Sequence, residues 1–471
     1  METRLKVPEE YRLFAPWEKA ADRIISPIEE FIQKQTASAM LLVVMTLIAL
    51  VLANSPLSEA YHHFFEKELA LVFNSWELRM TLHHWINDAL MVFFFFMIGL
   101  EIKRELLEGE LSNLKVALLP VIAAVGGMLV PATIYALINY GEPTLKGWGI
   151  PMATDIAFSI SALVLLRRYV PSTLVTFLVA LAIVDDLGAV IVIALFYTRN
   201  INLEALGGAL GVWGLLWIFN RAGISHWVPY FVGGVILWLF MLFSGVHATI
   251  AGVLTAFAIP SRPKLIPAYL GEILQKYLEV CDDVPASKAP HTLTSCQKKI
   301  IQSIHMAVKD VQPPSLRMEH ALHIPVALGV IPIFALANAG VHLEPEALVR
   351  AFAHPVSLGI ILGLVVGKTV GIAGSSWLAF KLGIASLPRG ARPLQLVGVG
   401  MLAGIGFTMS LFISQLSWPG EKTLLQQAKM GILLASSLAA LTGYLWLRFV
   451  SPKRNSDPKS KPQKSSLNGQ I

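Results

Sequence analysis

One apolar stretch decides what kind of fold this chain can adopt: residues 172–198, STLVTFLVALAIVDDLGAVIVIALFYT. Within it only Asp185 and Asp186, at the midpoint, carry a charge. A helix of about 20 predominantly apolar residues spans the hydrocarbon core of a bilayer. Residues 172–198 therefore predict a transmembrane helix, and the two adjacent carboxylates at its centre call for a physical explanation.

The composition of the whole chain agrees with this prediction. Of its 471 residues 55% are hydrophobic and only 14% are charged, whereas a soluble protein carries about 25% charged residues. The high apolar content and the net charge of only +6 exclude intrinsic disorder, and two cysteines are too few for a disulfide-built domain. We therefore expect an all-α membrane protein that crosses the bilayer several times.

Apolar segments of helical length divide the chain further. We predict twelve spans within a transmembrane domain of residues 38–450, at 39–57, 85–101, 116–138, 148–166, 172–198, 204–219, 227–243, 246–259, 323–340, 356–380, 394–416 and 425–447. With this count, 29 Lys and Arg residues fall on the side of both termini and 7 on the other, with Lys368 inside a span. Cytoplasmic loops carry an excess of positive charge. We therefore expect both termini in the cytoplasm and the protein in the bacterial cytoplasmic (inner) membrane.

Four parts of the sequence are predicted to lie outside the bilayer. Residues 1–37 have apolar positions at helical spacing, which fits either an amphipathic helix on the membrane surface or a loosely ordered extension. Residues 64–85 alternate apolar and polar side chains around Asn74, which predicts a β-hairpin. Residues 261–318 form a long polar cytoplasmic loop, and the basic tail 451–471 is predicted to be disordered.

The most informative residues are ionisable groups at membrane depth. Asp155, Asp185, Asp186 and Lys368 lie near the middle of the fourth, fifth and tenth spans, where each charge costs about 2.5–3.5 kcal/mol on insertion scales. One aspartate and Lys368 could form a purely structural ion pair. Three carboxylates against one lysine leave a negative surplus, which indicates a cation site or a proton relay.

The spacing of the two adjacent aspartates suggests a division of roles. Neighbouring helix residues are about 100° apart around the axis, so Asp185 and Asp186 cannot point at the same spot on a regular helix. One of them can face Lys368 while the other faces a cavity. Carboxylate oxygens suit a hard cation, and no His/Cys cluster indicates a transition metal.

Irregular helices are predicted in two places. The fourth span contains Pro151 and Thr154-Asp155, which indicate unwinding. The eleventh span has four glycines that fit either close packing or a second break: Gly398, Gly400, Gly404 and Gly406. If segments 3–5 and 10–12 are inverted repeats, the two places correspond, and such paired interruptions mark a transporter's binding site. A glycine stripe on the tenth span predicts close packing beside Lys368: Gly363, Gly367 and Gly371.

Seven local motifs carry a resemblance to a known family. They are ATDIAF (153–158), AIVDDLGA (182–189), Gly367-Lys368, IGLEIKRE (98–105), SGVHAT (244–249), LANAGV (336–341) and GIGFTMS (404–410). With these seven motifs in order along the sequence, the chain resembles the bacterial NhaA Na⁺/H⁺ antiporter family across residues 38–450. The resemblance implies twelve helices with segments 4 and 11 broken and crossing.

The resemblance also implies an activity and a site. The activity is electrogenic export of Na⁺ or Li⁺ in exchange for protons by alternating access, which serves pH and sodium homeostasis. Asp185 and Asp186 would be the cation and proton carboxylates, with Thr154 as a further ligand. Asp155 would offset the positive helix ends at the crossing, and Lys368 would pair with Asp185.

The same resemblance implies regulation and assembly. The pH response would come from a cluster at the cytoplasmic funnel, although solvated loop charges are the alternative interpretation: Glu101, Glu105, Glu319, His320 and His323. The hairpin 64–85 would join a homodimer. We expect Na⁺, Li⁺ and H⁺ as transported ions and the lipid bilayer as partner, with no cofactor, nucleic acid or enzymatic activity.

The sequence fits three other classes of function less well. Another sodium-coupled secondary transporter of similar architecture would need basic or hydroxyl groups around an anion pocket, and Lys368 is the only basic residue predicted at depth. A channel would need a lining repeated around an axis. A membrane-embedded enzyme would need a nucleophile or metal motif at depth, and the sequence offers no such arrangement.

Overall fold

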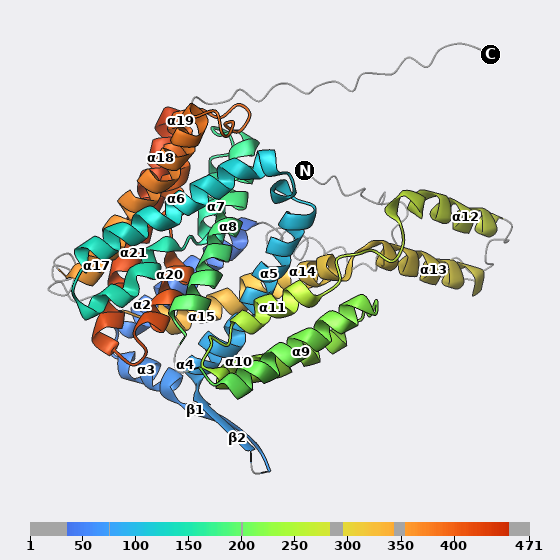
Figure 1. The fold of residues 1–471 in the computed structure, drawn as a ribbon, viewed down its shortest axis with the longest axis horizontal. Helices are drawn as coiled ribbons and strands as arrows, with labels where there is room; N and C mark the ends of the chain where they lie inside the picture. Colours follow the sequence, from blue (N-terminus) through green and yellow to red (C-terminus); the bar gives the residue numbers. More distant parts are fainter. Residues whose placement is uncertain (1–34, 75, 199–200, 283–294, 343–353, 452–471) are drawn as a thin grey trace, which may run out of the picture. The chain divides into compact units, whose positions relative to one another are not determined.

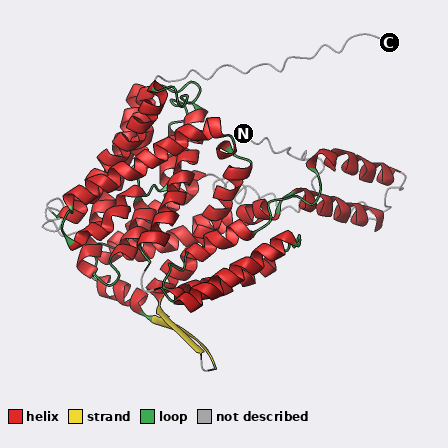
Figure 2. Cartoon of the chain, viewed as in Figure 1, coloured by secondary structure: helices red, strands yellow, loops and turns green. Residues whose placement is uncertain are grey.

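The computed structural model describes residues 35–74, 76–198, 201–282, 295–342 and 354–451. These residues are almost entirely helical, with one two-stranded sheet (Figure 2). The predictions for residues 1–37 and 451–471 fall almost wholly outside the described residues. The chain divides into two compact units, the first formed by Met1–Ser112 with Ala189–Ala347 and the second by Asn113–Gly188 with Leu348–Ile471.

The elements of the first unit lie on either side of the second unit's first segment in the sequence. They are α2 (Gln35–Ala53), α3 (Ser58–Glu66), β1 (Glu68–Phe73), β2 (Trp76–Thr81), α4 (Leu82–His84), α5 (Met91–Leu107), α9 (Leu203–Arg221), α10 (Trp227–Ser244), α11 (Ile250–Ala258), α12 (Leu270–Asp282), α13 (Ser295–Val311), α14 (Pro314–Pro325) and α15 (Ile331–Asn338) (Figure 1). Two π-helical stretches, Trp85–Leu90 and Val326–Val330, join α4 to α5 and α14 to α15.

The second unit contains the remaining helices of the described residues, both long and short. They are α6 (Leu114–Ile138), a 3-10 segment (Pro143–Met152), α7 (Ile156–Leu165), most of α8 (Ser172–Phe196), α17 (Pro355–Leu362), α18 (Lys368–Lys381), α19 (Pro393–Ala403), α20 (Phe407–Ser417) and α21 (Lys422–Val450). A third π-helical stretch, Gly363–Gly367, joins α17 to α18.

The described residues contain eight helices that are long and apolar enough to cross a membrane, or up to eleven if each of three bent pairs counts as one span. Every predicted span except 246–259 overlaps one of these. The predicted span 39–57 ends early, because α2 turns into α3 with a bend of 112°. The predicted segment 246–259 contains only α11, a helix of nine residues.

Neighbouring side chains satisfy the carbonyl groups at the end of the short helix α11. Trp213 donates to Leu254 O at 3.0 Å and Asn220 donates to Ala258 O at 2.7 Å. Lys103 Nζ donates to Phe257 O at 2.8 Å and also to Ile259 O. Exposed backbone groups are costly in lipid, so these bonds allow a helix of nine residues to end within an apolar core.

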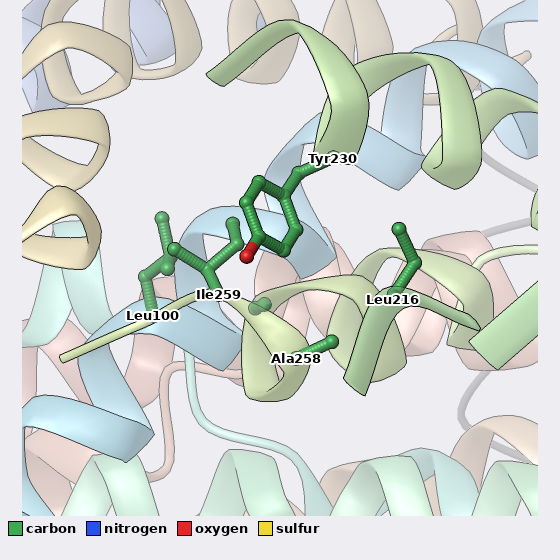
Figure 3. Packing of buried hydrophobic residues seen from close by; sticks show 6 residues of the cluster. Leu100, Leu216, Tyr230, Ala258 and Ile259 are labelled. Atoms are coloured by element: carbon green, nitrogen blue, oxygen red, sulfur yellow. The ribbon is translucent and has the colours of Figure 1, made fainter. Parts of the chain in front are cut away.

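That core packs α5, α9, α10 and α11 against one another. Its buried members are Leu100, Leu216, Tyr230, Ala256, Ala258 and Ile259 (Figure 3). The Tyr230 hydroxyl would be costly to bury without a partner, and it donates to Ile224 O at 2.9 Å.

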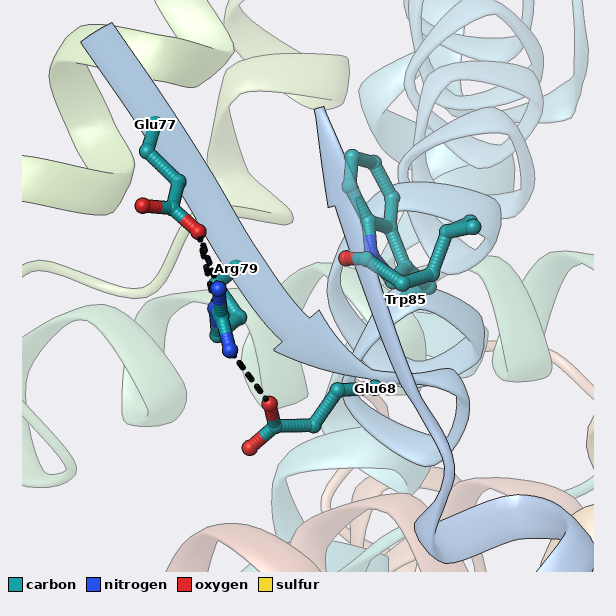
Figure 4. Close-up of polar contacts among 5 residues, drawn as sticks. Glu68, Glu77, Arg79 and Trp85 are labelled. Carbon is teal, nitrogen blue, oxygen red and sulfur yellow. Dashed lines mark hydrogen bonds and ion pairs between the residues drawn. The ribbon is translucent and has the colours of Figure 1, made fainter. Parts of the chain in front are cut away.

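The predicted β-hairpin forms, but it is shorter than residues 64–85. The strands β1 and β2 pair antiparallel from Glu68 opposite Thr81 to Phe73 opposite Trp76. Residues 64–66 belong to α3, and residues 82–85 already begin the next helix. Arg79 bonds Glu77 at 2.6 Å and Glu68 at 3.3 Å, which raises the pKa of its guanidinium (Figure 4).

The segment predicted as a polar loop, 261–318, contains helices. The helices α12 and α13 pack against each other, and α14 begins at Pro314 as the first part of a span that runs from Pro314 to Asn338. Each of α12 and α13 has apolar residues at helical spacing within a polar composition, so a reading by composition alone missed them. In α12, the ion pair with Lys276 at 2.8 Å lowers the pKa of Glu272.

In the second unit, α6 packs closely against α18. A Cβ atom at Gly126 would lie 2.5 Å from Gly371 O, and one at Gly367 would lie 2.8 Å from the Cα of Pro131. Only a residue without a side chain fits at such an approach. The packing role predicted for the glycine stripe is confirmed at these positions, and the approach holds Lys368 inside the unit.

Candidate functional site

Four ionisable side chains are buried together with the helix breaks in the second unit. Asp155 is 2% exposed, Asp185 and Asp186 are each 1% exposed, and Lys368 is 0% exposed. The Lys368 ammonium forms an ion pair and hydrogen bond with Asp185 Oδ2. The sequence predicted the burial, and the family resemblance implied this pairing.

The backbone is interrupted at residues 153–155, where the sequence predicted unwinding. The 3-10 segment Pro143–Met152 and α7 meet there at an angle of 40°. The backbone groups freed by the break find partners on the eleventh segment, since Asp155 N donates to Ile405 O at 2.6 Å. The Thr154 hydroxyl donates to Ala403 O at 2.8 Å.

A second break lies between α19 and α20, which meet at an angle of 48°. The glycines of this segment serve both purposes that the sequence left open. Gly398 and Gly400 pack against neighbouring helices, while Gly404 and Gly406 flank the break. A Cβ atom at Gly406 would lie 2.9 Å from Ala153 O, so the two breaks are in direct contact.

Asp155 binds the N-terminal ends of both half-helices at once. Its Oδ1 accepts a hydrogen bond from Phe158 N in α7 at 3.2 Å. Its Oδ2 accepts from Thr408 N at 3.0 Å and from the Thr408 hydroxyl at 2.6 Å in α20. A carboxylate at a helix N-terminus satisfies free N–H groups and offsets the positive end of the helix dipole.

Asp185 and Asp186 lie beside the first break. Thr154 lies close to Asp185. The charge of Asp186 acts on the Lys368 ammonium. The π-helical stretch Gly363–Gly367 ends directly before Lys368, and local π-helix is frequent at functional sites.

The five residues predicted for the pH response lie in the first unit. Glu101 and Glu105 are on α5, and α14, which packs against α5, carries Glu319, His320 and His323. All five are in helices and not in a loop, but His320 and His323 are exposed to solvent. The sequence-based interpretation missed Arg104, which approaches Glu105 at 3.3 Å and Glu319 at 3.4 Å and so joins the two helices.

Sequence reasoning also missed two serines at the breaks. Ser159 of α7 donates to Leu402 O at 2.9 Å, and Ser410 of α20 donates to Ile150 O at 2.8 Å. Each serine therefore satisfies a carbonyl at the end of the other broken segment. The sequence does show a serine about one helical turn after each break. Serine is common in membrane helices, however, so its presence alone does not identify a functional residue.

The fold and this site define a multi-pass helical membrane protein whose ionisable groups are buried at paired helix breaks. Comparison with known proteins shows its family. The family model described as Na⁺/H⁺ antiporter 1 matches residues 29–447. The chain therefore belongs to the Na⁺/H⁺ antiporter 1 family.

Curated relatives agree along nearly the whole chain. A Na⁺/H⁺ antiporter NhaA of Sulfurimonas denitrificans is 53% identical over 94% of this chain and 100% of its own length. One of Acidithiobacillus ferrooxidans is 48% identical over 92% of this chain and 100% of its own. A Na⁺/H⁺ antiporter NhaA 1 of Saccharophagus degradans is 45% identical over 94% and 95%.

Proposed function

We propose that this protein exports Na⁺ or Li⁺ in exchange for protons by alternating access, with Asp185 and Asp186 as the exchanging carboxylates. The observation that supports this assignment most directly is the buried charge surplus of three aspartates against Lys368. A buried carboxylate is stable if it accepts several hydrogen bonds, as Asp155 does, or if it pairs with a cation or holds a proton. Asp155 and the pair of Asp185 with Lys368 meet these conditions, so the remaining negative charge is that of Asp186, which a proton or a cation can neutralise. Exchange follows when the same carboxylate oxygens bind a proton and a cation alternately.

The four groups then have different roles. Asp186 releases its proton and accepts the cation. Asp185 is held by Lys368 until the cation loads, and its oxygens can then turn to the ion. Thr154 donates its hydroxyl proton to Ala403 O, which leaves the oxygen lone pairs available to a hard cation. Asp155 stabilises the two half-helix ends and remains charged.

The fold proposed for exchange has twelve spans with inverted repeats and crossing broken helices. The reciprocal bonds of the two breaks support this arrangement, because each broken segment satisfies groups freed in the other. The short helix α11, with side-chain hydrogen bonds to the carbonyls at its end, would belong to the eighth span and bring the count of candidate spans from eleven to twelve. We place the protein in the bacterial inner membrane with both termini in the cytoplasm, as the charge asymmetry indicates.

Two further assignments complete the proposal. The helices α5 and α14 carry the pH-responsive cluster, and the ion pairs of Arg104 with Glu105 and Glu319, which connect the two helices there, support this role. The hairpin β1–β2 joins two copies of the chain. Its exposed apolar residues support this role, since Leu69 is 52% exposed and Val72 is 66% exposed.

Everted membrane vesicles with an established pH gradient test the proposed exchange. Adding Na⁺ or Li⁺ should collapse the gradient in vesicles that contain the protein and leave it intact in vesicles without it. A gradient that survives both cations at every pH would contradict the proposal. Na⁺-driven uptake of an organic anion would favour the sodium-coupled symporter instead.

Competition for one site predicts the pH dependence of Na⁺ affinity. Because the same carboxylates bind H⁺ or Na⁺, the apparent Na⁺ affinity should weaken as pH falls, by up to about tenfold per pH unit for one competing proton. His320→Ala should shift the pH profile of exchange without removing this trend, because His320 lies outside the site. The measurement is apparent Na⁺ affinity at several pH values in reconstituted vesicles. An affinity that does not change with pH would rule out shared-site competition.

A further inference from the structure

A closed ring of three hydrogen bonds links two spans of the first unit. Asn338 Nδ2 donates to Asn87 Oδ1 at 2.9 Å, and Asn87 Nδ2 lies 3.2 Å from His83 Nδ1. His83 Nε2 lies 3.0 Å from Asn338 Oδ1. Asn87 is 8% exposed and Asn338 is 0% exposed, so a lost bond here would leave a buried polar group unpaired.

The ring determines the protonation state of His83. An amide nitrogen can only donate, so Nδ1 of His83 must be the accepting nitrogen. Nε2 then carries the proton and donates to Asn338 Oδ1. Each of the three side chains gives one hydrogen bond to the ring and accepts one, and this pattern requires a neutral imidazole.

The ring occupies a defined place on the two spans that it joins. His83 is the second residue of the span Leu82–Leu107, and Asn338 is the last residue of the span Pro314–Asn338. The opposite ends of these same spans carry Glu101 and Glu319. Glu101 is 18 residues after His83, which is about 27 Å along a helix.

We propose that this ring is a second pH-responsive element, which holds the two spans together while His83 is neutral and releases them when His83 is protonated. A proton on Nδ1 turns the acceptor into a donor that faces the Asn87 amide nitrogen. Rotating the amide to present its oxygen would remove the bond from Asn338, so no rearrangement keeps all three bonds. The effect on exchange rests on the proposed function, whereas the effect on stability does not.

The elements next to the ring carry other titratable groups. They are His84 and Asp88 from the same span, Glu77 and Arg79 from β2, and Glu59, Tyr61, His62, His63 and Glu66 from α3, which packs against α4; α15 carries none. The charge of His247 acts on Asp88. His84 is the nearest matched residue, with its ring 6.4 Å from that of His83. Its Nδ1 bonds the Thr81 hydroxyl at 2.9 Å outside the ring, so His84→Gln serves as the control.

Thermal unfolding in detergent tests the ring without any transport. The range from about pH 8 to about pH 5 brackets the ordinary histidine pKa of about 6.5. Over this range the unfolding midpoint should fall in wild type and in His84→Gln. It should fall less in His83→Gln, by about 2–4 °C. Gln cannot be protonated in this range, so its midpoint should vary less with pH. A pH dependence in His83→Gln equal to that of the control would overturn the proposal.

Asn87→Asp is an independent variant in which the unfolding midpoint should change with pH in the opposite direction. Its carboxylate still accepts from Asn338, but it faces His83 Nδ1 favourably only when that nitrogen is protonated. The unfolding midpoint should therefore rise, relative to wild type, as pH falls through the same range. If the unfolding midpoint of Asn87→Asp falls more steeply than that of wild type as pH is lowered, the proposed role of the ring is wrong.

Exchange in reconstituted vesicles tests the regulatory part. The pH profile of Na⁺-dependent proton flux should shift in His83→Gln and in Asn87→Asp but not in His84→Gln. If these variants change the unfolding midpoint but not the pH profile of exchange, the ring has no regulatory role and only holds the two spans together. Absence of exchange in wild type at every pH would instead contradict the proposed function.

Discussion

Asp186→Asn is expected to reduce Na⁺- and Li⁺-dependent proton flux to the level of vesicles without the protein, while the protein stays folded and inserted. Asparagine keeps the size of aspartate at a position that is 1% exposed, so packing is preserved. It cannot release a proton or supply the negative charge that a cation needs. The loss should therefore be complete at every pH.

A matched variant separates this effect from a general loss of charge. Asp310 lies in α13 and is exposed, and Asp310→Asn makes the same chemical change away from the site. It should retain the wild-type flux. Flux in reconstituted vesicles and the unfolding midpoint in detergent are measured for both variants. Exchange that persists in Asp186→Asn would remove this residue from the site.

Lys368→Ala is expected to lower both stability and exchange. The lysine is 0% exposed and pairs with Asp185, which is 1% exposed. Removing one partner of a buried ion pair leaves the other charge uncompensated and costs about 3–5 kcal/mol. Thermal unfolding in detergent should show a clear fall of the midpoint, together with loss of Na⁺-dependent proton flux.

Two further variants show whether a loss of stability in Lys368→Ala comes from the unpaired charge of Asp185. Lys381→Ala removes an exposed lysine at the other end of the same helix, α18, and should leave the midpoint unchanged. Lys368→Ala combined with Asp185→Ala removes both charges and should recover much of the lost stability, because no buried charge is then left unpaired. If Lys368→Ala abolishes exchange at unchanged stability, the lysine carries a proton and its pairing role is secondary.

Most of the spans could be predicted from the sequence because lipid allows few solutions. A chain in hydrocarbon must satisfy its backbone hydrogen bonds within each helix, so a long apolar run almost has to be a span. The runs around Asp186 and Lys368 match α8 and α17–α18 for this reason. Ionisable residues at depth were equally clear, since their cost makes an incidental occurrence improbable.

The predictions weakened where local composition gives no unique answer. The segment 261–318 looked like a loop because its composition is polar, yet it contains α12 and α13, which pack against each other. The segment 246–259 was predicted as a span although it is shorter than about 20 residues, and α11 covers only Ile250–Ala258, with Trp213, Asn220 and Lys103 bound to the carbonyls at its end. Both structures depend on contacts with other segments, which composition alone does not show.

By itself, the sequence determined that this is a helical membrane protein of the antiporter family, with three aspartates and one lysine buried at depth. Burial in lipid carries a free-energy cost for each polar group separately. The positions of spans and of buried charges can therefore be predicted from the local sequence. Only the tertiary structure decided that Asp155 binds both half-helices, that Ser159 and Ser410 bond each other's broken segment, and that His83 closes a ring with two asparagines. A hydrogen bond requires two groups at about 3 Å in a definite direction, and for residues far apart in sequence only the packing of helices sets that geometry.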